Sequence, residues 1–262
     1  MYLSTVSETV VFCVGGEIDP SFWLVRMEES TQAKRLTIAI DGPSGAGKST
    51  VGRALAKRLG YVYIDTGAMY RAVALKVKER ALVLEDESKL SALVSSLHIT
   101  FVGKGKETSV LCNGKDVTKA IRSPEISRLA SDISRKKVVR EALVQKQREM
   151  GMGGGVVLEG RDIGTVVFPD AEIKFYLDAD TEERGKRRFK ELLEKGMKVD
   201  FNDTLEEVRN RDHSDMNRAI SPLRKAEDAF FIDSTGRTVE EIVEEMVQRV
   251  MARQRKDETS HC

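Results

Sequence analysis

Residues 42–49 carry the pattern that restricts function most, Gly-Pro-Ser-Gly-Ala-Gly-Lys-Ser, which fits G-x-x-x-x-G-K-[ST]. The preceding stretch, 36–41, is apolar and β-prone, and the following stretch, 50–59, has apolar residues at helical spacing. In this strand–loop–helix setting, glycines let backbone N–H groups turn inward around phosphate oxygens, and the helix N-terminus presents a partial positive charge. Lys48 can reach the β- and γ-phosphates, and the Ser49 hydroxyl is placed to bind Mg²⁺. This phosphate loop (residues 42–49) predicts that the chain binds a nucleoside triphosphate.

Charged residues also follow two further predicted strands, at the strand ends where α/β sheets bind their ligands. The first run is Asp65-Thr66-Gly67-Ala68-Met69-Tyr70-Arg71. Two interpretations stay open for it: Arg71 reaches a second phosphate group, or it is a solvated arginine in a strand-to-helix turn. The second run is Glu159-Gly160-Arg161-Asp162-Ile163-Gly164, and it favours a functional role because buried charges need partners or a ligand.

Three more stretches carry arginines, and in the first two the spacing places the charged residues on one side of a helix if the region is helical. They are Arg184, Arg187 and Arg188; Arg211, Asp215 and Arg218; and Arg140 with Ser131 upstream. Any one set is more often a solvated helix face than a site. Together they indicate an arginine cluster around phosphates, because guanidinium groups bind phosphate oxygens in pairs. Transfer between two polyanionic nucleotides needs such a cluster to offset their repulsion.

The elements that must position these residues alternate from residue 35 onward. Apolar strands are predicted at 36–41, 61–65, 156–159, 173–178 and 229–233. Helices are predicted near 48–59, 67–80, 87–96, 124–149, 181–195, 204–212 and 238–253. The last begins with a capping box of Thr238 and Glu241. Such alternation predicts a doubly wound α/β domain, with a five-stranded parallel sheet and helices on both faces.

Residues 98–118 interrupt this alternation. They have the pattern of short antiparallel strands, with turns at Gly103–Gly105 and at Asn113-Gly114. We therefore expect a small β insert within the larger fold.

Composition excludes several classes of protein. Of 262 residues, 40% are hydrophobic and 32% are charged, which suits a globular protein with a real core. Lys and Arg number 43 against 42 Asp and Glu, so we expect no nucleic-acid partner. Cys13, Cys112 and Cys262 lack metal-ligand spacing and fit a reducing, cytoplasmic setting. No apolar run approaches the roughly 18 residues of a membrane span, so we expect no membrane partner.

Residues 1–34 show no sustained hydrophobic period, and we expect a poorly ordered N-terminal extension there, before a domain at 35–262. Met27 precedes a short polar stretch and is a candidate alternative start of translation. Residues 1–26 are then either native or a start-site artefact. Mass spectrometry of the native protein would decide, since a mature N-terminus at Met1 would exclude the artefact.

Four segments, in their order and spacing, resemble bacterial cytidylate kinases, a family of nucleoside monophosphate kinases. They are 40–50, 65–71, 159–169 and 211–218. The similarity covers roughly residues 35–252. It implies a P-loop kinase fold in which the β insert belongs to a monophosphate-binding region at about 95–135, with a helical lid at about 181–198. The implied reaction moves the γ-phosphoryl group of ATP to CMP or dCMP with Mg²⁺ present, in a cytoplasmic enzyme that is a monomer.

The resemblance also implies roles for individual residues. Catalytic roles fall to Lys48, Arg161, Arg184 and Arg188, and Ser49 binds the metal. ATP is bound by Gly42, Pro43, Ser44, Gly45, Ala46, Gly47, Lys48, Ser49, Thr50, Arg184 and Arg187. Cytosine is recognised by Ser131, Arg140 and Asp162, the sugar by Arg211 and Asp215, and the acceptor phosphate by Thr66, Arg71, Arg161 and Arg218.

The chain departs from the family pattern at a few positions. Thr66 stands where serine is frequent and keeps the hydroxyl, Glu159 stands where some members have aspartate, and Ser214 stands where some have arginine. The N-terminal extension has no counterpart in the pattern.

Alternative functions stay open on the residues alone. A kinase for UMP or another small acceptor is the nearest. A GTP-dependent switch would need N-K-x-D, and Asn113-Gly114-Lys115-Asp116 misplaces the lysine. A DNA- or transport-linked ATPase would need a long acidic Walker B strand ending, which we do not find.

Overall fold

The computed structural model describes residues 35–102 and 108–259, which fall into two compact units. The sheet unit comprises the described residues 35–66 and 151–259, and the insert unit comprises the described residues 67–150. The extension expected at 1–34, the turn expected at Gly103–Gly105, and Cys13 and Cys262 lie outside the described residues. No helix in the described ranges is long and apolar enough to cross a membrane.

A five-stranded parallel sheet forms the centre of the sheet unit, as the sequence predicts. The strands are β1 (Thr37–Asp41), β2 (Val62–Asp65), β6 (Val156–Gly160), β7 (Ile173–Asp178) and β8 (Phe230–Asp233). Their spatial order is β2-β6-β1-β7-β8, and every neighbouring pair is parallel. The carboxyl ends of all five strands therefore meet at one edge, with β1 and the phosphate loop that follows it in the middle.

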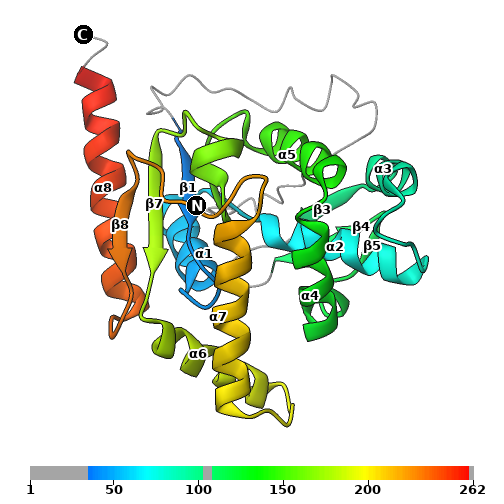
Figure 1. Cartoon of the computed structure of the whole chain (residues 1–262). Helices are drawn as coiled ribbons and strands as arrows, with labels where there is room; N and C mark the ends of the chain where they lie inside the picture. Colours follow the sequence, from blue (N-terminus) through cyan, green and yellow to red (C-terminus); the bar gives the residue numbers. More distant parts are fainter. Residues whose placement is uncertain (1–34, 103–107, 260–262) are drawn as a thin grey trace, which may run out of the picture. The chain divides into compact units, whose positions relative to one another are not determined.

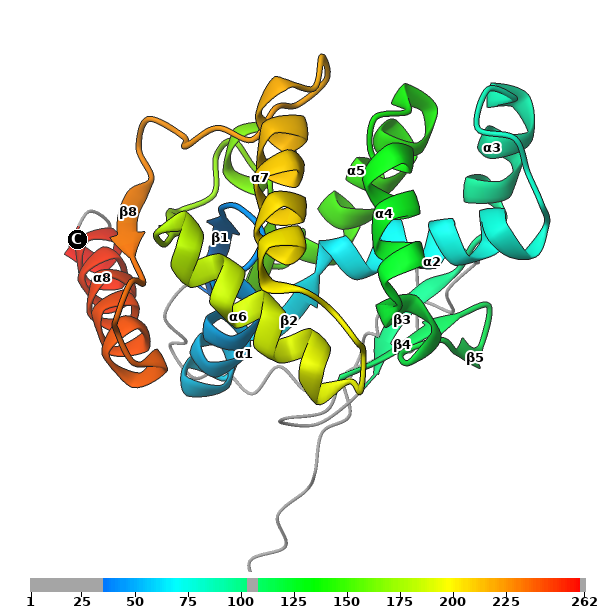
Figure 2. The same cartoon turned by 60° about the horizontal axis from the view of Figure 1, so that its bottom comes forward.

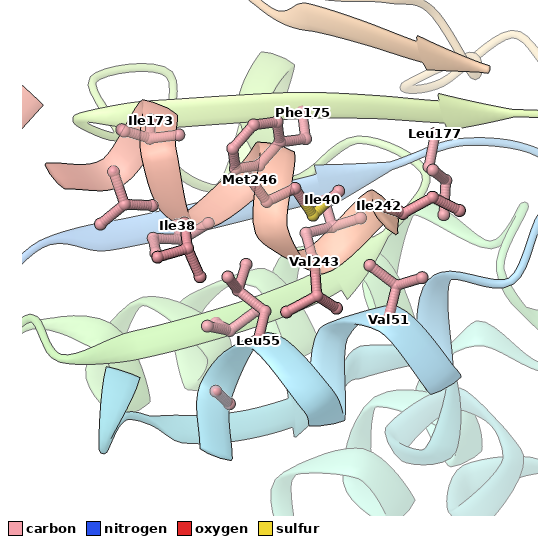
Figure 3. Close-up of a cluster of buried hydrophobic side chains, with 14 of the residues drawn as sticks. Ile38, Ile40, Val51, Leu55, Ile173, Phe175, Leu177, Ile242, Val243 and Met246 are labelled. Atoms are coloured by element: carbon pink, nitrogen blue, oxygen red, sulfur yellow. The ribbon is translucent and has the colours of Figure 1, made fainter. Parts of the chain in front are cut away.

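The long helices of the same unit can be followed in Figure 1. They are α1 (Lys48–Leu59), α6 (Thr181–Glu194), α7 (Phe201–Asn217) and α8 (Val239–Thr259). Helices α1 and α8 cover one face of the sheet, and Figure 3 shows their apolar side chains meeting those of β1 and β7. Helices α6 and α7 pack against each other, as the two views in Figures 1 and 2 show.

The core between the sheet and helices α1 and α8 is built from every second side chain of the strands. Ile38 and Ile40 of β1 point to this face, as do alternate residues of β7, because side chains alternate along a strand. Val243 and Met246 of α8 lie one turn apart and close the core from outside. The other face of β7 carries Lys174, whose side chain lies 3.0 Å from the place that a Cβ on Gly164 would take, in the π-helical turn η3 (Ile163–Val167).

The predicted capping box of α8 is confirmed. The backbone N–H of Thr238 donates to Glu241 Oε2 at 2.8 Å, and the N–H of Glu241 donates to Thr238 Oγ1 at 3.2 Å. Helix α7 begins three residues earlier than predicted, because the Asp200 carboxylate accepts from the N–H groups of Asn202 and Asp203 and caps its first turn.

The insert unit contains the predicted antiparallel β insert. Its strands β3 (Ile99–Val102), β4 (Ser109–Cys112) and β5 (Lys115–Asp116) pair in the order β3-β4-β5. Asn113 and Gly114 form the turn between β4 and β5, with φ of 51° and 77°. The string Asn113-Gly114-Lys115-Asp116, compared above with the N-K-x-D of a GTP-dependent switch, therefore lies in a hairpin, as the sequence predicts. The unit's helices are α2 (Thr66–Glu79, entered from the sheet unit at Thr66), α3 (Glu87–Ser95), α4 (Pro124–Ile133) and α5 (Lys137–Gly151).

The single helix predicted at 124–149 is wrong, because α4 and α5 are separated at residues 134–136. The Ser134 hydroxyl bonds the carbonyl of Ser131, and the N–H groups of Arg135 and Lys136 donate to carbonyls three residues back. Such tight turns end an α-helix. Serine side chains compete for backbone hydrogen bonds in this way. The apolar spacing that predicted one helix carries no information about such a hydrogen bond, so it did not reveal the break.

Candidate phosphate-transfer site

The phosphate loop adopts a conformation that requires glycine at several positions. Gly42, Gly45 and Gly47 have φ of 148°, 78° and 93°. A Cβ atom on Gly42 would lie 1.9 Å from the carbonyl oxygen of Leu177 in the neighbouring strand β7. Helix α1 begins directly after Gly47, whose backbone is left-handed and provides no side-chain cap. The N–H groups of its first turn are thus directed toward the loop, which suits an anion.

Three carbonyls of the loop accept hydrogen bonds from side chains. Lys48 Nζ donates to the carbonyl of Pro43 at 2.5 Å, and Arg184 Nη1 donates to that of Ser44 at 3.1 Å. The hydroxyl of Ser234 donates to the carbonyl of Ala46 at 3.0 Å. Because the C=O and the following N–H of a trans peptide point in opposite directions, holding these carbonyls also orients the loop N–H groups.

Lys48 sits in an electrostatic setting that favours a nearby phosphate. Its side chain is buried, and burial together with the positive charge of Arg161 lowers its pKa to about 7. Glu159 opposes this effect. Phosphate oxygens would stabilise the charged ammonium form, so an anion in the loop and protonated Lys48 favour each other.

Glu159, at the end of β6, connects three functional segments. Its Oε1 accepts from the Ser49 hydroxyl at 2.6 Å, and its backbone carbonyl accepts from Thr66 Oγ1 at 2.6 Å. Burial and the negative charge of Asp65 raise the pKa of the Glu159 carboxyl. Its second oxygen, Oε2, is buried, and a hydrogen bond between this carboxyl and the Tyr63 hydroxyl opposes the rise in pKa.

The structure brings together the charged residues predicted after β6 and on α7. Arg161 Nε donates to Asp215 Oδ2 at 2.8 Å, and Arg218 Nη2 lies 3.6 Å from Asp162 Oδ1. Burial raises the pKa of Asp215, but the charges of Arg161 and Arg211 outweigh it and hold the pKa below its usual value. This acidic and basic set lies within electrostatic range of Lys48, since Arg161, Arg211 and Asp215 all shift the pKa of Lys48.

The three arginines of α6 have different surroundings. Arg184 is buried, and its guanidinium also bonds Asp212 Oδ2 at 2.5 Å and the carbonyl of Ala179 at 3.0 Å. Arg187 bonds both the hydroxyl and the carbonyl of Ser234. Arg188 Nη1 pairs with Glu191 at 2.9 Å. Arg184 and Arg187 therefore reach the phosphate loop through protein contacts, which their helical spacing did not reveal.

Three of the predicted CMP-binding residues lie in the insert unit. Arg71 is on α2, Ser131 is on α4, and Arg140 is on α5. Arg140 is buried, its guanidinium carbon lies 5.8 Å from the centre of the Tyr70 ring, and its Nη1 donates to the carbonyl of Ser134 at 3.2 Å. Ser134 in turn bonds the carbonyl of Ser131, so these groups form one connected cluster.

A family model described as cytidylate kinase matches residues 38–252, which include the phosphate loop and every charged segment described above. The chain belongs to the cytidylate kinase family. A cytidylate kinase of Syntrophotalea carbinolica is 54% identical over 221 residues, covering 84% of this chain and 94% of that protein. Cytidylate kinases of Geobacter sulfurreducens and Caldicellulosiruptor saccharolyticus are 52% and 49% identical, covering 84% and 82% of this chain and 94% and 95% of theirs. The family indicated by the motifs is confirmed.

Sequence reasoning missed two residues in the site of this cytidylate kinase family member. Asp41, directly before the loop, is buried and accepts from the N–H groups of Ile163 and Gly164 at 2.8 and 2.7 Å. Burial raises its pKa to about 6, although these two hydrogen bonds oppose the shift. Ser234 follows β8 and contacts the loop carbonyl of Ala46. Both lie at carboxyl ends of strands, so the rule that identified Arg161 could have found them.

Proposed function

We propose that this chain transfers the γ-phosphoryl group of ATP to CMP or dCMP, producing ADP and CDP or dCDP. One observation carries the proposal beyond membership of the cytidylate kinase family. Arg161 follows β6, the parallel neighbour of β1, so it lies at the same edge of the sheet as the phosphate loop that follows β1, and its charge lowers the pKa of Lys48 there. A cation suited to a second phosphate therefore acts within electrostatic range of the residue that would hold the first.

The donor half of the reaction rests on the phosphate loop. Its oriented N–H groups and Lys48 would bind the β- and γ-phosphates and offset the charge that develops on the transferred group. Arg184, Arg187 and Arg188 would complete the environment of ATP from α6, the first two by holding the loop. Transfer would occur in line from ATP to the CMP oxygen, without a covalent intermediate on the protein.

The residues present fit a Mg²⁺ ion that arrives with ATP. The Ser49 hydroxyl and the carboxylate of Glu159 are oxygen ligands of the kind that Mg²⁺ prefers. Among the described residues there is no cluster of three or more potential metal-binding side chains, which agrees with a metal held largely by phosphate oxygens and water. When bound, the ion would neutralise charge on the phosphates.

The acceptor half rests on the residues to which the family resemblance gives roles. We propose that Thr66, Arg71, Arg161 and Arg218 bind the phosphate of CMP, that Arg211 and Asp215 bind its sugar hydroxyls, and that Ser131, Arg140 and Asp162 recognise cytosine. The Asp162 carboxylate would accept a hydrogen bond from the exocyclic amine, which uracil lacks. A buried polar group left without its partner disfavours the wrong base.

We further propose that the enzyme works as a monomer in the cytoplasm. The balanced charge of the chain and the buried free thiol of Cys112 support this setting.

A single assay tests the proposed activity. The purified chain is incubated with ATP, Mg²⁺ and one monophosphate at a time, and ADP release is followed with CMP, dCMP, UMP or AMP. We expect rapid release with CMP and dCMP and little with the others. Equal or faster turnover of UMP would support the alternative acceptor, and ADP release that is independent of any monophosphate would contradict the kinase assignment.

A further inference from the structure

Ser234 makes a hydrogen bond with each of its polar groups. It follows β8 in the sheet unit and is 1% exposed. Its N–H donates to the carbonyl of Asp178 at the end of β7, at 2.8 Å, and its hydroxyl donates to the carbonyl of Ala46 in the phosphate loop, at 3.0 Å. The residue therefore connects the ends of two strands to the loop.

Arg187 of α6 holds Ser234 from the other side. Its Nη1 donates to the Ser234 hydroxyl oxygen at 3.0 Å, and its Nη2 donates to the Ser234 carbonyl at 2.8 Å. The third guanidinium nitrogen, Nε, donates to Glu183 at 3.1 Å. Because Arg187 donates to the hydroxyl oxygen, the hydroxyl proton is available to Ala46, and the two hydrogen bonds form a relay.

The Ala46 carbonyl is a critical point in the loop. The peptide group that contains this carbonyl also contains the N–H of Gly47, the residue directly before α1. Fixing the carbonyl on the outer side directs this N–H toward the inner side, where an anion binds. The Pro43 and Ser44 carbonyls are held similarly, but by Lys48 and Arg184. Unlike Lys48 and Arg184, Ser234 is uncharged, so its side chain adds no positive charge near a bound phosphate.

We infer that Ser234 is a positioning residue for the donor nucleotide: held by Arg187, it fixes the Ala46 carbonyl and thereby orients the Gly47 N–H toward the phosphates of ATP. Its hydrogen bonds join Ala46, Asp178 and Arg187. The inference adds a positioning residue to the proposed function. It rests on that function only in taking CMP as the acceptor nucleotide.

The first test is Ser234→Ala, which removes the hydroxyl and leaves the Ala46 carbonyl without its donor. We expect the Kd and KM for ATP to rise on the order of tenfold, while the KM for CMP stays within about twofold. Thr235→Ala is the matched control, since Thr235 Oγ1 accepts from the N–H of Asp180 and belongs to an exposed residue. An unchanged ATP affinity in Ser234→Ala, or an equal rise in the KM for both substrates, would overturn the inference.

A double-mutant cycle tests the part played by Arg187. If Arg187 acts through Ser234, Arg187→Gln should weaken ATP binding in the wild-type background and add little in the Ser234→Ala background. Additive losses would overturn the relay and indicate a direct contact between Arg187 and ATP. Ser234→Cys keeps the size of the side chain but donates weakly, so we expect an intermediate ATP affinity even if Ser234→Ala folds poorly.

Nucleotide binding must be measured separately from turnover, by calorimetry with ATP alone. If the wild-type chain fails to phosphorylate CMP, the proposed function fails, but the ATP affinities of the variants still test Ser234. If the wild type phosphorylates CMP and Ser234→Ala binds ATP normally, only the inference about Ser234 fails.

Discussion

The Ser49 hydroxyl donates a hydrogen bond to Glu159 Oε1 across 2.6 Å, joining the first turn of α1 to the end of β6. The two residues are 110 positions apart in sequence, and they meet because β6 pairs with β1 in register, with Glu159 opposite Ile40. This contact identifies which carboxylate lies beside the hydroxyl expected to bind the metal.

Removing the charge of that carboxylate should weaken the response to Mg²⁺. Glu159→Gln keeps the size of the side chain and an acceptor for Ser49, but it lacks the negative charge that attracts the ion. We expect the Mg²⁺ concentration for half-maximal activity to rise by about 10- to 100-fold. Glu172→Gln is the control, because Glu172 bonds the N–H of Thr37 at the start of β1. Identical Mg²⁺ titrations for the wild type and Glu159→Gln would contradict the assignment.

Truncating the lysine of the loop should reduce turnover. Lys48→Ala removes the mobile charge that would offset the γ-phosphoryl group, and we expect kcat to fall by about 10²- to 10³-fold. Steady-state assays with CMP at saturating ATP measure this. Lys57→Ala, an exposed lysine in the last turn of α1, should leave kcat near the wild-type value. Near-normal turnover by Lys48→Ala would refute the role given to Lys48.

The carboxylate after Arg161 should control the choice of base. Asp162→Ala removes the acceptor proposed for the cytosine amine, so we expect the preference for CMP over UMP, as a ratio of kcat/KM values, to decrease by about 10-fold or more. The KM for CMP should also rise, because Arg218 loses a neighbouring charge. Asp170→Ala changes an exposed aspartate and is the control. Unchanged selectivity in Asp162→Ala would move cytosine recognition to other residues.

Asp41 should make stability depend on pH in an unusual direction. Its folded pKa of about 6 lies above the ordinary value of 3.8, so the folded state holds a proton more tightly than the unfolded state does. The stability that this gives is complete below pH 3.8 and is lost as the pH rises through 6. Relative to Asp41→Asn, the free energy of unfolding of the wild type should fall by about 2 kcal/mol between pH 4 and pH 7. Urea titrations at several pH values measure the difference, and parallel curves would exclude the shift.

The strands and the phosphate loop were predictable because each depends on local sequence. Continuous apolar runs marked the buried parallel strands, and the glycines of the loop are needed for its positive φ values. Arg161 and Asp162 were found for a related reason, since charged residues directly after a buried strand point to the ligand-binding edge. The same reasoning applied at Asp41 and Ser234 would have identified both.

The contacts of α6 could not be predicted in this way. Helical spacing places Arg184, Arg187 and Arg188 on one side of α6. It does not reveal that Arg184 bonds Asp212 or that Arg187 bonds Ser234. Those partners come from α7 and from the end of β8, and their proximity depends on the order of the strands and on how α6 and α7 pack. The break between α4 and α5 depended likewise on a hydroxyl that competes with the helix backbone.

The anchoring of the phosphate loop also bears on how the protein is made. The partner of the Ser44 carbonyl lies 140 residues further along the chain, and that of the Ala46 carbonyl lies 188 residues further. At roughly 5–20 residues per second, a ribosome needs about 10–40 s to cover the longer distance. During that time the emerging chain carries the complete motif without its outer supports. We therefore expect tight ATP binding to arise only near the end of synthesis, so that unfinished chains do not sequester nucleotide.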